Sequence, residues 1–127
     1  MDIDAYFSRT GYTGPRAATL EHLRAIIAHH VQAIPFENLT PLAQLPVRLD
    51  IESLQQKILR EQRGGYCFEQ NLLLWRALQQ LGFSVSGLAA RVVWNAPDAV
   101  LARSHMLLRV QLDGASHVVD EIGRAHV

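Results

Sequence analysis

Residues 63–94, RGGYCFEQNLLLWRALQQLGFSVSGLAARVVW, change their periodicity halfway and so indicate the fold class. Over residues 67–81 apolar side chains recur every three or four positions, which is typical of an amphipathic helix, and Gly82 supplies a C-terminal stop. From residue 85 to residue 94 the chain is aliphatic and β-branched over the length of a strand. The stretch therefore predicts a helix followed directly by a β-strand.

The chain before this stretch is predicted to be helical over residues 2–9, 19–34 and 50–61. Thr19 and Asp50 are good N-caps for the second and third of these helices. The second helix is expected to stop before Pro35, because the residue before a proline avoids the helical region. Residues 40–49 contain two prolines and are expected to form a loop with an extended piece.

The chain after this stretch predicts two more strands, over residues 106–112 and 116–120. Asp113-Gly114 between them is a strong hairpin signal. The fold class is therefore α+β, with an N-terminal helical bundle followed by the opening strands of an antiparallel sheet. We expect two domains, a helical one over residues 1–83 and a partial β-domain over residues 84–127.

Composition excludes several classes of protein. The 127 residues contain 12 Lys+Arg and 12 Asp+Glu, a net charge of zero, which argues against a nucleic-acid binder or a polybasic membrane anchor. No apolar run reaches the roughly 20 residues of a membrane-spanning helix, and the acidic N-terminus differs from a secretory signal. A single cysteine excludes a disulfide framework and a cysteine-rich zinc site, so we expect a cytoplasmic protein.

Cys67 is the candidate nucleophile. Gly64-Gly65 break the chain just before the helix that starts near Cys67, so the thiol is expected at the first turn. Free amides and the helix dipole at such a position favour a thiolate and lower the pKa of a cysteine. The alternative is a buried cysteine that packs as a small apolar residue.

His105 is the candidate base among six histidines, because it begins a predicted strand. It lies eight residues before Asp113, and Asp120 lies six residues after Gly114, so the two side chains can meet across the hairpin. The alternative is an isolated histidine on a strand. No metal site is expected, since the adjacent His29-His30 pair points in directions about 100° apart on a helix.

Four segments together resemble a known family: residues 33–39 (AIPFENL), 63–71 (RGGYCFEQN), 104–108 (SHMLL) and 118–120 (VVD). They look like the N-terminal part of the arylamine N-acetyltransferases, over nearly the whole chain to about Asp120. The resemblance implies that Cys67 accepts the acetyl group, that His105 is its base and that Asp120 orients the imidazole. The family fold implied is a helical domain, then a β-barrel domain, then an α/β lid.

The same resemblance implies acetyl-CoA as co-substrate and an arylamine, arylhydrazine or N-hydroxyarylamine as acceptor, in a ping-pong reaction through an acetyl-cysteine. Arg63 and Glu37 could form an ion pair that braces the loop before the nucleophile, or an ordinary surface pair. Phe36 and Phe68 could line an acceptor pocket or simply belong to the core. The supporting residues expected from the matched motifs are Arg63, Gly65, Tyr66, Phe36, Glu37, Phe68 and Asn71, and we also expect Gln70 and Asn71 to satisfy backbone groups around the helix start.

Residues 121–127, EIGRAHV, depart from the family pattern, which continues after the aspartate with a Val-Gly-Phe-Gly type of segment. We therefore expect a C-terminally truncated form of the enzyme that lacks most of the acetyl-CoA site. One alternative is a non-catalytic fragment that associates with itself through open sheet edges. Another is a different Cys-His-Asp enzyme, such as a cysteine protease or a transglutaminase.

Overall fold

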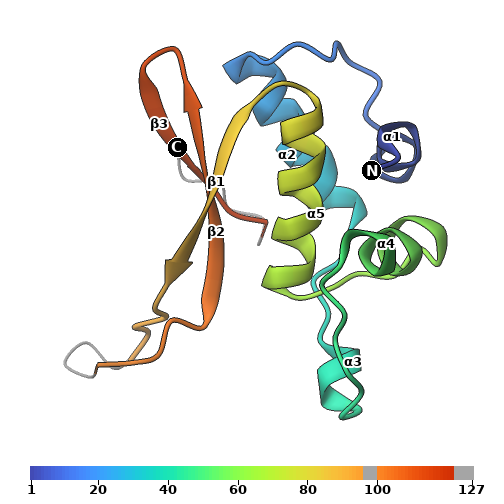
Figure 1. Ribbon diagram of the computed structural model, residues 1–127, viewed down its shortest axis with the longest axis vertical. Coiled ribbons are helices and arrows are strands. Elements are labelled where there is room, and N and C mark those ends of the chain that lie inside the picture. Colours follow the sequence, from blue (N-terminus) through green and yellow to red (C-terminus); the bar gives the residue numbers. More distant parts are fainter. Residues whose placement is uncertain (96–99, 122–127) are drawn as a thin grey trace.

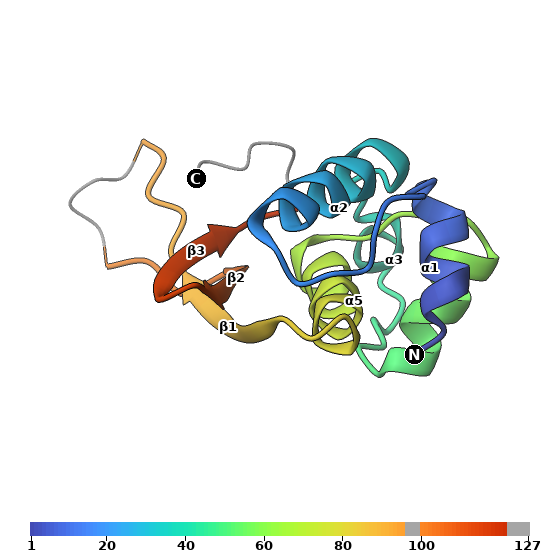
Figure 2. The same ribbon diagram turned by 90° about the horizontal axis from the view of Figure 1, so that it is seen from above.

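Helices lie on one side of a three-stranded antiparallel sheet in the computed structural model, which describes residues 1–95 and 100–121 (Figures 1 and 2). This mixed helix and sheet architecture agrees with the fold class predicted above. The elements in chain order are α1 (Ile3–Thr10), α2 (Leu20–Ala33), α3 (Leu39–Leu42), α4 (Ile51–Leu54), the π-helix η1 (Gln55–Arg60), α5 (Cys67–Gln80), β1 (Ser84–Ala90), β2 (His105–Leu112) and β3 (Ala115–Val119).

The helix starts follow from local side-chain caps. Thr19 Oγ1 accepts a hydrogen bond from the His22 amide at 3.3 Å, and Asp50 Oδ1 accepts one from the Ser53 amide at 2.9 Å. Each cap satisfies one of the amides that a first helical turn leaves without a partner. The two predicted N-caps are thus confirmed, and α2 ends at Ala33, before Pro35, as expected.

Two helical segments differ from the prediction. The third helix is regular only over α4 and continues as the π-helix η1, after which the Glu61 amide bonds to the Gln56 carbonyl five residues back. Within the predicted loop 40–49, residues up to Leu42 belong to the one-turn helix α3. Pro41 is tolerated there because the amides of a first turn have no helical partner.

The sheet has the order β1-β2-β3. Asp113 and Gly114 both have positive φ, 51° and 79°, which is the conformation of the tight hairpin turn predicted between β2 and β3. The first strand is shorter than expected and ends at Ala90 instead of residue 94. Ala90 pairs with His105, the first residue of β2, so β2 offers no further partner beyond that point.

Helix α5 joins the helices to the sheet, because it packs directly against β1 and β2. Along β2 the side chains of Met106, Leu108 and Val110 are buried, whereas Arg109 and Gln111, which alternate with them, are exposed. One face of the sheet is therefore buried, and its side chains share a continuous apolar core with those of the helices. No helix in the described parts of the chain is long and apolar enough to cross a membrane.

Candidate functional site

The loop before Cys67 is held by backbone contacts to the segment that follows α2. Gly65 pairs with Phe36 in an isolated parallel bridge, in which the Gly65 amide donates to the Pro35 carbonyl at 3.3 Å and the Glu37 amide donates to the Gly65 carbonyl at 3.1 Å. A Cβ atom on Gly64 would lie 1.9 Å from the Pro35 carbonyl oxygen. Glycine is therefore required at position 64 by close backbone approach, and this approach places Cys67 at the first position of α5.

Two acidic residues and two basic residues surround this loop. Glu69 Oε2 accepts a hydrogen bond from the Tyr66 amide at 3.1 Å, and its Oε1 lies 2.7 Å from Lys57 Nζ. Glu37 Oε1 lies 3.0 Å from Arg63 Nη2 and 3.4 Å from Lys57 Nζ. The pair of Arg63 and Glu37 considered from the sequence is thus present, within a larger charge cluster that was not predicted.

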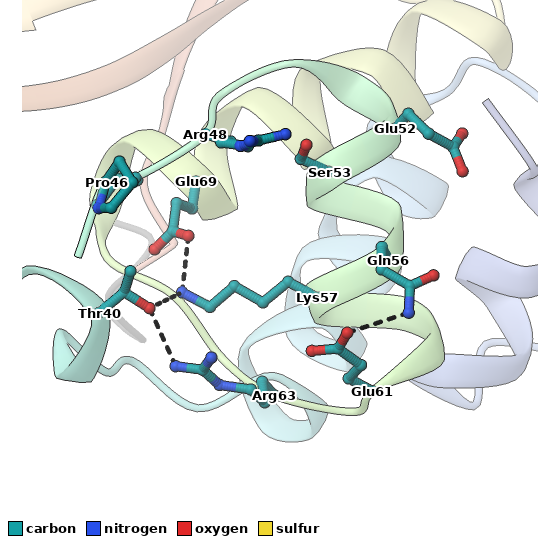
Figure 3. A pocket seen from close by; sticks show the side chains of 11 residues that line it. Thr40, Pro46, Arg48, Glu52, Ser53, Gln56, Lys57, Glu61, Arg63 and Glu69 are labelled. Atoms are coloured by element: carbon teal, nitrogen blue, oxygen red, sulfur yellow. Dashed lines mark hydrogen bonds and ion pairs between the residues drawn. The ribbon is translucent and has the colours of Figure 1, made fainter.

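The same cluster borders a cavity of about 460 Å³ on the side of α4 and η1 (Figure 3). Figure 3 shows the Lys57 ammonium directed at Glu69 and Thr40, and the Arg63 guanidinium directed at the same Thr40 hydroxyl. Lys57 and Arg63 are therefore occupied by ion pairs and hydrogen bonds within the protein. Glu69 could have been found in the sequence as an acidic residue three positions after the N-cap, whereas nothing in the sequence points to Lys57.

A buried polar chain reaches the loop from the first two helices. His30 Nδ1 lies 2.9 Å from the Tyr6 hydroxyl, and Nε2 lies 3.2 Å from Gln70 Oε1. Gln70 Nε2 donates to the carbonyls of Pro35, at 3.1 Å, and Gly65, at 2.8 Å. Gln70 Oε1 is an acceptor, so we assign the imidazole proton to Nε2 of His30, which leaves Nδ1 to accept the proton of the Tyr6 hydroxyl.

Complete burial lowers the pKa of His30 to about 4, so this imidazole is neutral at neutral pH. The expectation that Gln70 satisfies backbone groups near the helix start agrees with the observed contacts. Asn71 does something different, because its Nδ2 donates to the Met106 carbonyl on β2 at 2.7 Å and to the carboxylate of Glu121. It therefore connects α5 to the sheet and to the residue after Asp120.

His105 and Asp120 meet across the hairpin. His105 Nε2 lies 2.9 Å from Asp120 Oδ2, and both side chains are largely buried. Cys67 Sγ lies 4.0 Å from the carbonyl oxygen of Ser104, the residue before His105, and the Met106 amide is also directed at this sulfur. The structure therefore brings Cys67 to the segment that carries His105, and His105 to Asp120.

The expected depression of the Cys67 pKa is wrong. Burial, which leaves the residue only 6% exposed, raises the pKa of the thiol, and the negative charges of Glu121 and Asp120 raise it further. The amides of Met106 and Phe68 act in the opposite direction and do not outweigh burial. The sulfur is therefore a neutral thiol at neutral pH.

Glu121 is the unexpected member of the site. It is 2% exposed, and burial raises its pKa to about 9, with the hydrogen bond and charge of Asp120 acting in the same direction. Its Oε2 accepts the hydrogen bond from Asn71 Nδ2. In the sequence, residue 121 stands apart only as a departure from the family pattern, and the other departing residues, 122–127, lie outside the described residues.

A small apolar cavity of about 200 Å³ lies beside His105 and is lined by Phe68, Gly87, Leu88, Ala89, His105 and Met106. Phe68 thus has the position expected for a pocket wall. Phe36 does not line this cavity and is 52% exposed. The Tyr66 ring lies against Phe68 instead of the cavity, with 5.6 Å between the ring centroids.

The chain is similar to proteins of a known family. A profile of the N-acetyltransferase family matches residues 19–122. The chain is 47% identical over 118 residues to an arylamine N-acetyltransferase of Mycolicibacterium smegmatis, covering 91% of this chain and 43% of that protein. It therefore belongs to the arylamine N-acetyltransferase family.

Solved structures show the same likeness. The arylamine N-acetyltransferase from M. tuberculosis superposes with a TM-score of 0.90 at 44% identity, over 94% of this chain and 46% of that one. The enzyme from Mycobacterium marinum in complex with CoA gives a TM-score of 0.88 at 42% identity, over 94% and 46%. The chain thus spans less than half the length of the relatives it matches.

Proposed function

We propose that this chain carries the acetyl-accepting site of an arylamine N-acetyltransferase. The observation that carries the proposal is that Cys67 contacts the residue before His105, whose imidazole is joined to Asp120 by a 2.9 Å hydrogen bond. In this proposal acetyl-CoA donates the acetyl group and an arylamine, arylhydrazine or N-hydroxyarylamine receives it. A relative that is solved in complex with CoA supports the choice of donor.

The raised pKa of the Cys67 thiol gives His105 a specific task. A neutral thiol must lose its proton as it attacks, so the imidazole accepts the Sγ proton while Sγ bonds to the acetyl carbonyl carbon. The bond from that carbon to the sulfur of CoA then breaks, and the departing thiolate takes the proton from the imidazolium. Asp120 accepts the hydrogen bond from Nε2 of His105, so Nδ1 is the nitrogen that accepts the Sγ proton. The carboxylate of Asp120 then stabilises the positively charged imidazolium.

The second half of the reaction returns the thiol. The acceptor nitrogen attacks the thioester carbon, an amide bond forms, and the C–Sγ bond breaks. His105 removes the proton that the nitrogen loses and delivers it to Sγ. The apolar cavity lined by Phe68 and Met106 beside the imidazole is the candidate location for the aromatic ring of the acceptor.

The wider assignments are proposals of the same kind. We take the three strands as the first strands of a β-barrel domain and the helices as a bundle domain, in a cytoplasmic enzyme without nucleic-acid or membrane partners. Arg63, Glu37, Gly65, Tyr66 and Asn71 would support the site by holding the loop and α5. The contacts of Glu37 and Asn71 described above support this role.

A second candidate function is a self-associating module without catalysis. Its support is the sheet order, which leaves β1 and β3 as edge strands among the described residues. Val118 on β3 is also 46% exposed. Open edges of this kind pair with strands of other copies.

Intact mass spectrometry after incubation with acetyl-CoA tests the first proposal. We expect the wild-type chain to gain one acetyl group and Cys67→Ala to gain none, while His105→Gln slows the gain. If Cys67→Ala gained acetyl as fast as the wild type, the nucleophile would be misassigned. A mass that rises with protein concentration in sedimentation experiments, without any acetylation, would favour the self-associating module.

A further inference from the structure

Glu121 is a buried titratable group that the reaction proposed above does not use. It follows Asp120 directly after β3 and is 2% exposed. One nitrogen of His105 and one carboxylate oxygen each of Asp120 and Glu121 lie within 4.8 Å of one another. The titratable groups around Glu121 among the described residues are Asp120 beside it, His105 on β2 and Cys67 at the start of α5. A charge on Glu121 would therefore act on all three residues of the proposed site.

The carboxyl groups of Asp120 and Glu121 are joined by a hydrogen bond. Ionised carboxylates only accept hydrogen bonds, so this contact requires a proton on one of the two groups. Asp120 is only partly buried and accepts a hydrogen bond from His105 Nε2, both of which suit a charged carboxylate. Glu121 is buried, and burial disfavours the charged form. The proton therefore belongs to Glu121.

The contacts of the individual oxygens indicate where this proton lies. Glu121 Oε2 accepts a hydrogen bond from Asn71 Nδ2, and the same Nδ2 donates to the Met106 carbonyl, which fixes the orientation of the amide. Glu121 Oε1 and Asp120 Oδ1 are buried and accept from no N–H or hydroxyl group among the described residues. A single proton on Oε1, donated to Asp120, removes the charge of Glu121 and gives both carboxyl groups a second partner.

We propose that Glu121 is a positioning residue that stays protonated and donates a hydrogen bond to the carboxylate of Asp120. Asp120 is then held by two donors, Nε2 of His105 and the carboxyl group of Glu121, so its rotation away from the imidazole would disturb both contacts. The proton also removes a charge that would raise the pKa of the Cys67 thiol and oppose the nucleophile. This positioning role rests on the proposed function, whereas the shared proton does not depend on it.

Infrared spectroscopy of the full chain tests the shared proton without any enzyme activity, because a protonated carboxyl group has a C=O stretch that a carboxylate lacks. We expect this band in the wild type at pH 7 and its loss in Glu121→Gln. The matched control is Glu61→Gln, which replaces an exposed glutamate after η1 and should keep the band. Absence of the band in the wild type, or its persistence in Glu121→Gln, would overturn the proposal.

The pH dependence of unfolding tests the same proton independently. Burial and the contact with Asp120 raise the pKa of Glu121 from its ordinary value of 4.5 to about 9, so between these values the folded chain holds a proton that the unfolded chain has lost. Stability from this group is therefore lost as the pH rises. Relative to Glu121→Gln, the unfolding equilibrium constant of the wild type should increase about a hundredfold between pH 6 and pH 8. An equal pH dependence of the two proteins in urea unfolding would contradict the shared proton.

Acetylation of Cys67 by acetyl-CoA, followed by intact mass spectrometry, tests the positioning role. The amide of Glu121→Gln still donates to Asp120 and accepts from Asn71, so this variant should react at nearly the wild-type rate. Glu121→Leu loses both contacts and should react about tenfold more slowly, while urea unfolding shows that it is folded.

A wild-type rate in the folded Glu121→Leu chain, or an equally slow rate in Glu121→Gln, would overturn the positioning role. A wild-type chain that is not acetylated at all would overturn the proposed function and this role together. The infrared band and the pH dependence of unfolding would still decide whether Glu121 and Asp120 share a proton.

Discussion

Gly64→Ala is the substitution for which the structure makes the sharpest prediction. The added methyl carbon would lie 1.9 Å from the Pro35 carbonyl oxygen and 2.9 Å from its carbon, and both are backbone atoms that cannot rotate away. The loop must therefore move away from the segment that follows α2. This movement breaks the bridge between Gly65 and Phe36, which consists of two backbone hydrogen bonds.

The cost can be worked out from these contacts. The loss of two hydrogen bonds lowers the free energy of unfolding by about 2 kcal/mol, and the forced displacement of a packed backbone lowers it by about 2 kcal/mol more. The lower entropy of alanine in the unfolded chain returns somewhat less than about 1 kcal/mol. We expect Gly64→Ala to lower the free energy of unfolding by about 3 kcal/mol.

Urea unfolding, followed by circular dichroism, measures this loss, and Gly82→Ala is the matched control. Gly82 has a φ of 89° and open space around its Cβ position, so alanine there costs only the backbone strain, about 1 kcal/mol. Alkylation of Cys67 in the native state should also become faster in Gly64→Ala, since the loop that positions the buried thiol has moved. If Gly64→Ala were no less stable than Gly82→Ala, the close approach would not constrain the loop.

Three further predictions concern the buried polar groups. The pKa of His30 is about 4 in the folded chain and about 6.5 in the unfolded chain, so the free energy of unfolding should fall by about 3 kcal/mol as the pH drops from 6.5 to 4. Urea unfolding across this pH range should show a much smaller fall in His30→Asn. Tyr6→Phe should cost about 2 kcal/mol at pH 7 in the same assay, because the buried Nδ1 of His30 loses its donor, and no loss would refute the assigned tautomer. Lys57→Met should lower the free energy of unfolding by about 3 kcal/mol, because Glu69 is left charged and buried, whereas Arg60→Met breaks an exposed pair and should lower it by less than about 1 kcal/mol. Equal losses for the two variants in chemical denaturation would contradict this difference.

The sequence predicts those features that depend on neighbours within a few positions. Thr19 and Asp50 are recognised as caps because they bond to amides three residues on. The hairpin at Asp113-Gly114 is equally local, and it makes the meeting of His105 with Asp120 predictable, since a known turn fixes which residues face each other.

Features that depend on distant residues are not predictable in this way. The pKa of Cys67 was expected to fall because the helix start is visible in the sequence, but burial and the carboxylates of Asp120 and Glu121 reverse the direction. Lys57 reaches the loop from η1, and its partner Glu69 lies twelve residues away. No short-range pattern encodes either contact.

The peptide unit between Gly65 and Tyr66 is held by two side chains at the start of α5, the amide of Gln70 and the carboxylate of Glu69. Its carbonyl accepts from Gln70 Nε2 at 2.8 Å, and its amide donates to Glu69 Oε2 at 3.1 Å, so both polar groups of this one unit are fixed by side chains that follow the nucleophile.

Each of these side chains is fixed in turn by another helix. His30 on α2 bonds to Gln70, and Lys57 on η1 pairs with Glu69. Rotation of the peptide unit would break contacts to both helices at once. The position of Cys67, one residue further on, is therefore determined by the packing of α2 and η1 as much as by α5 itself.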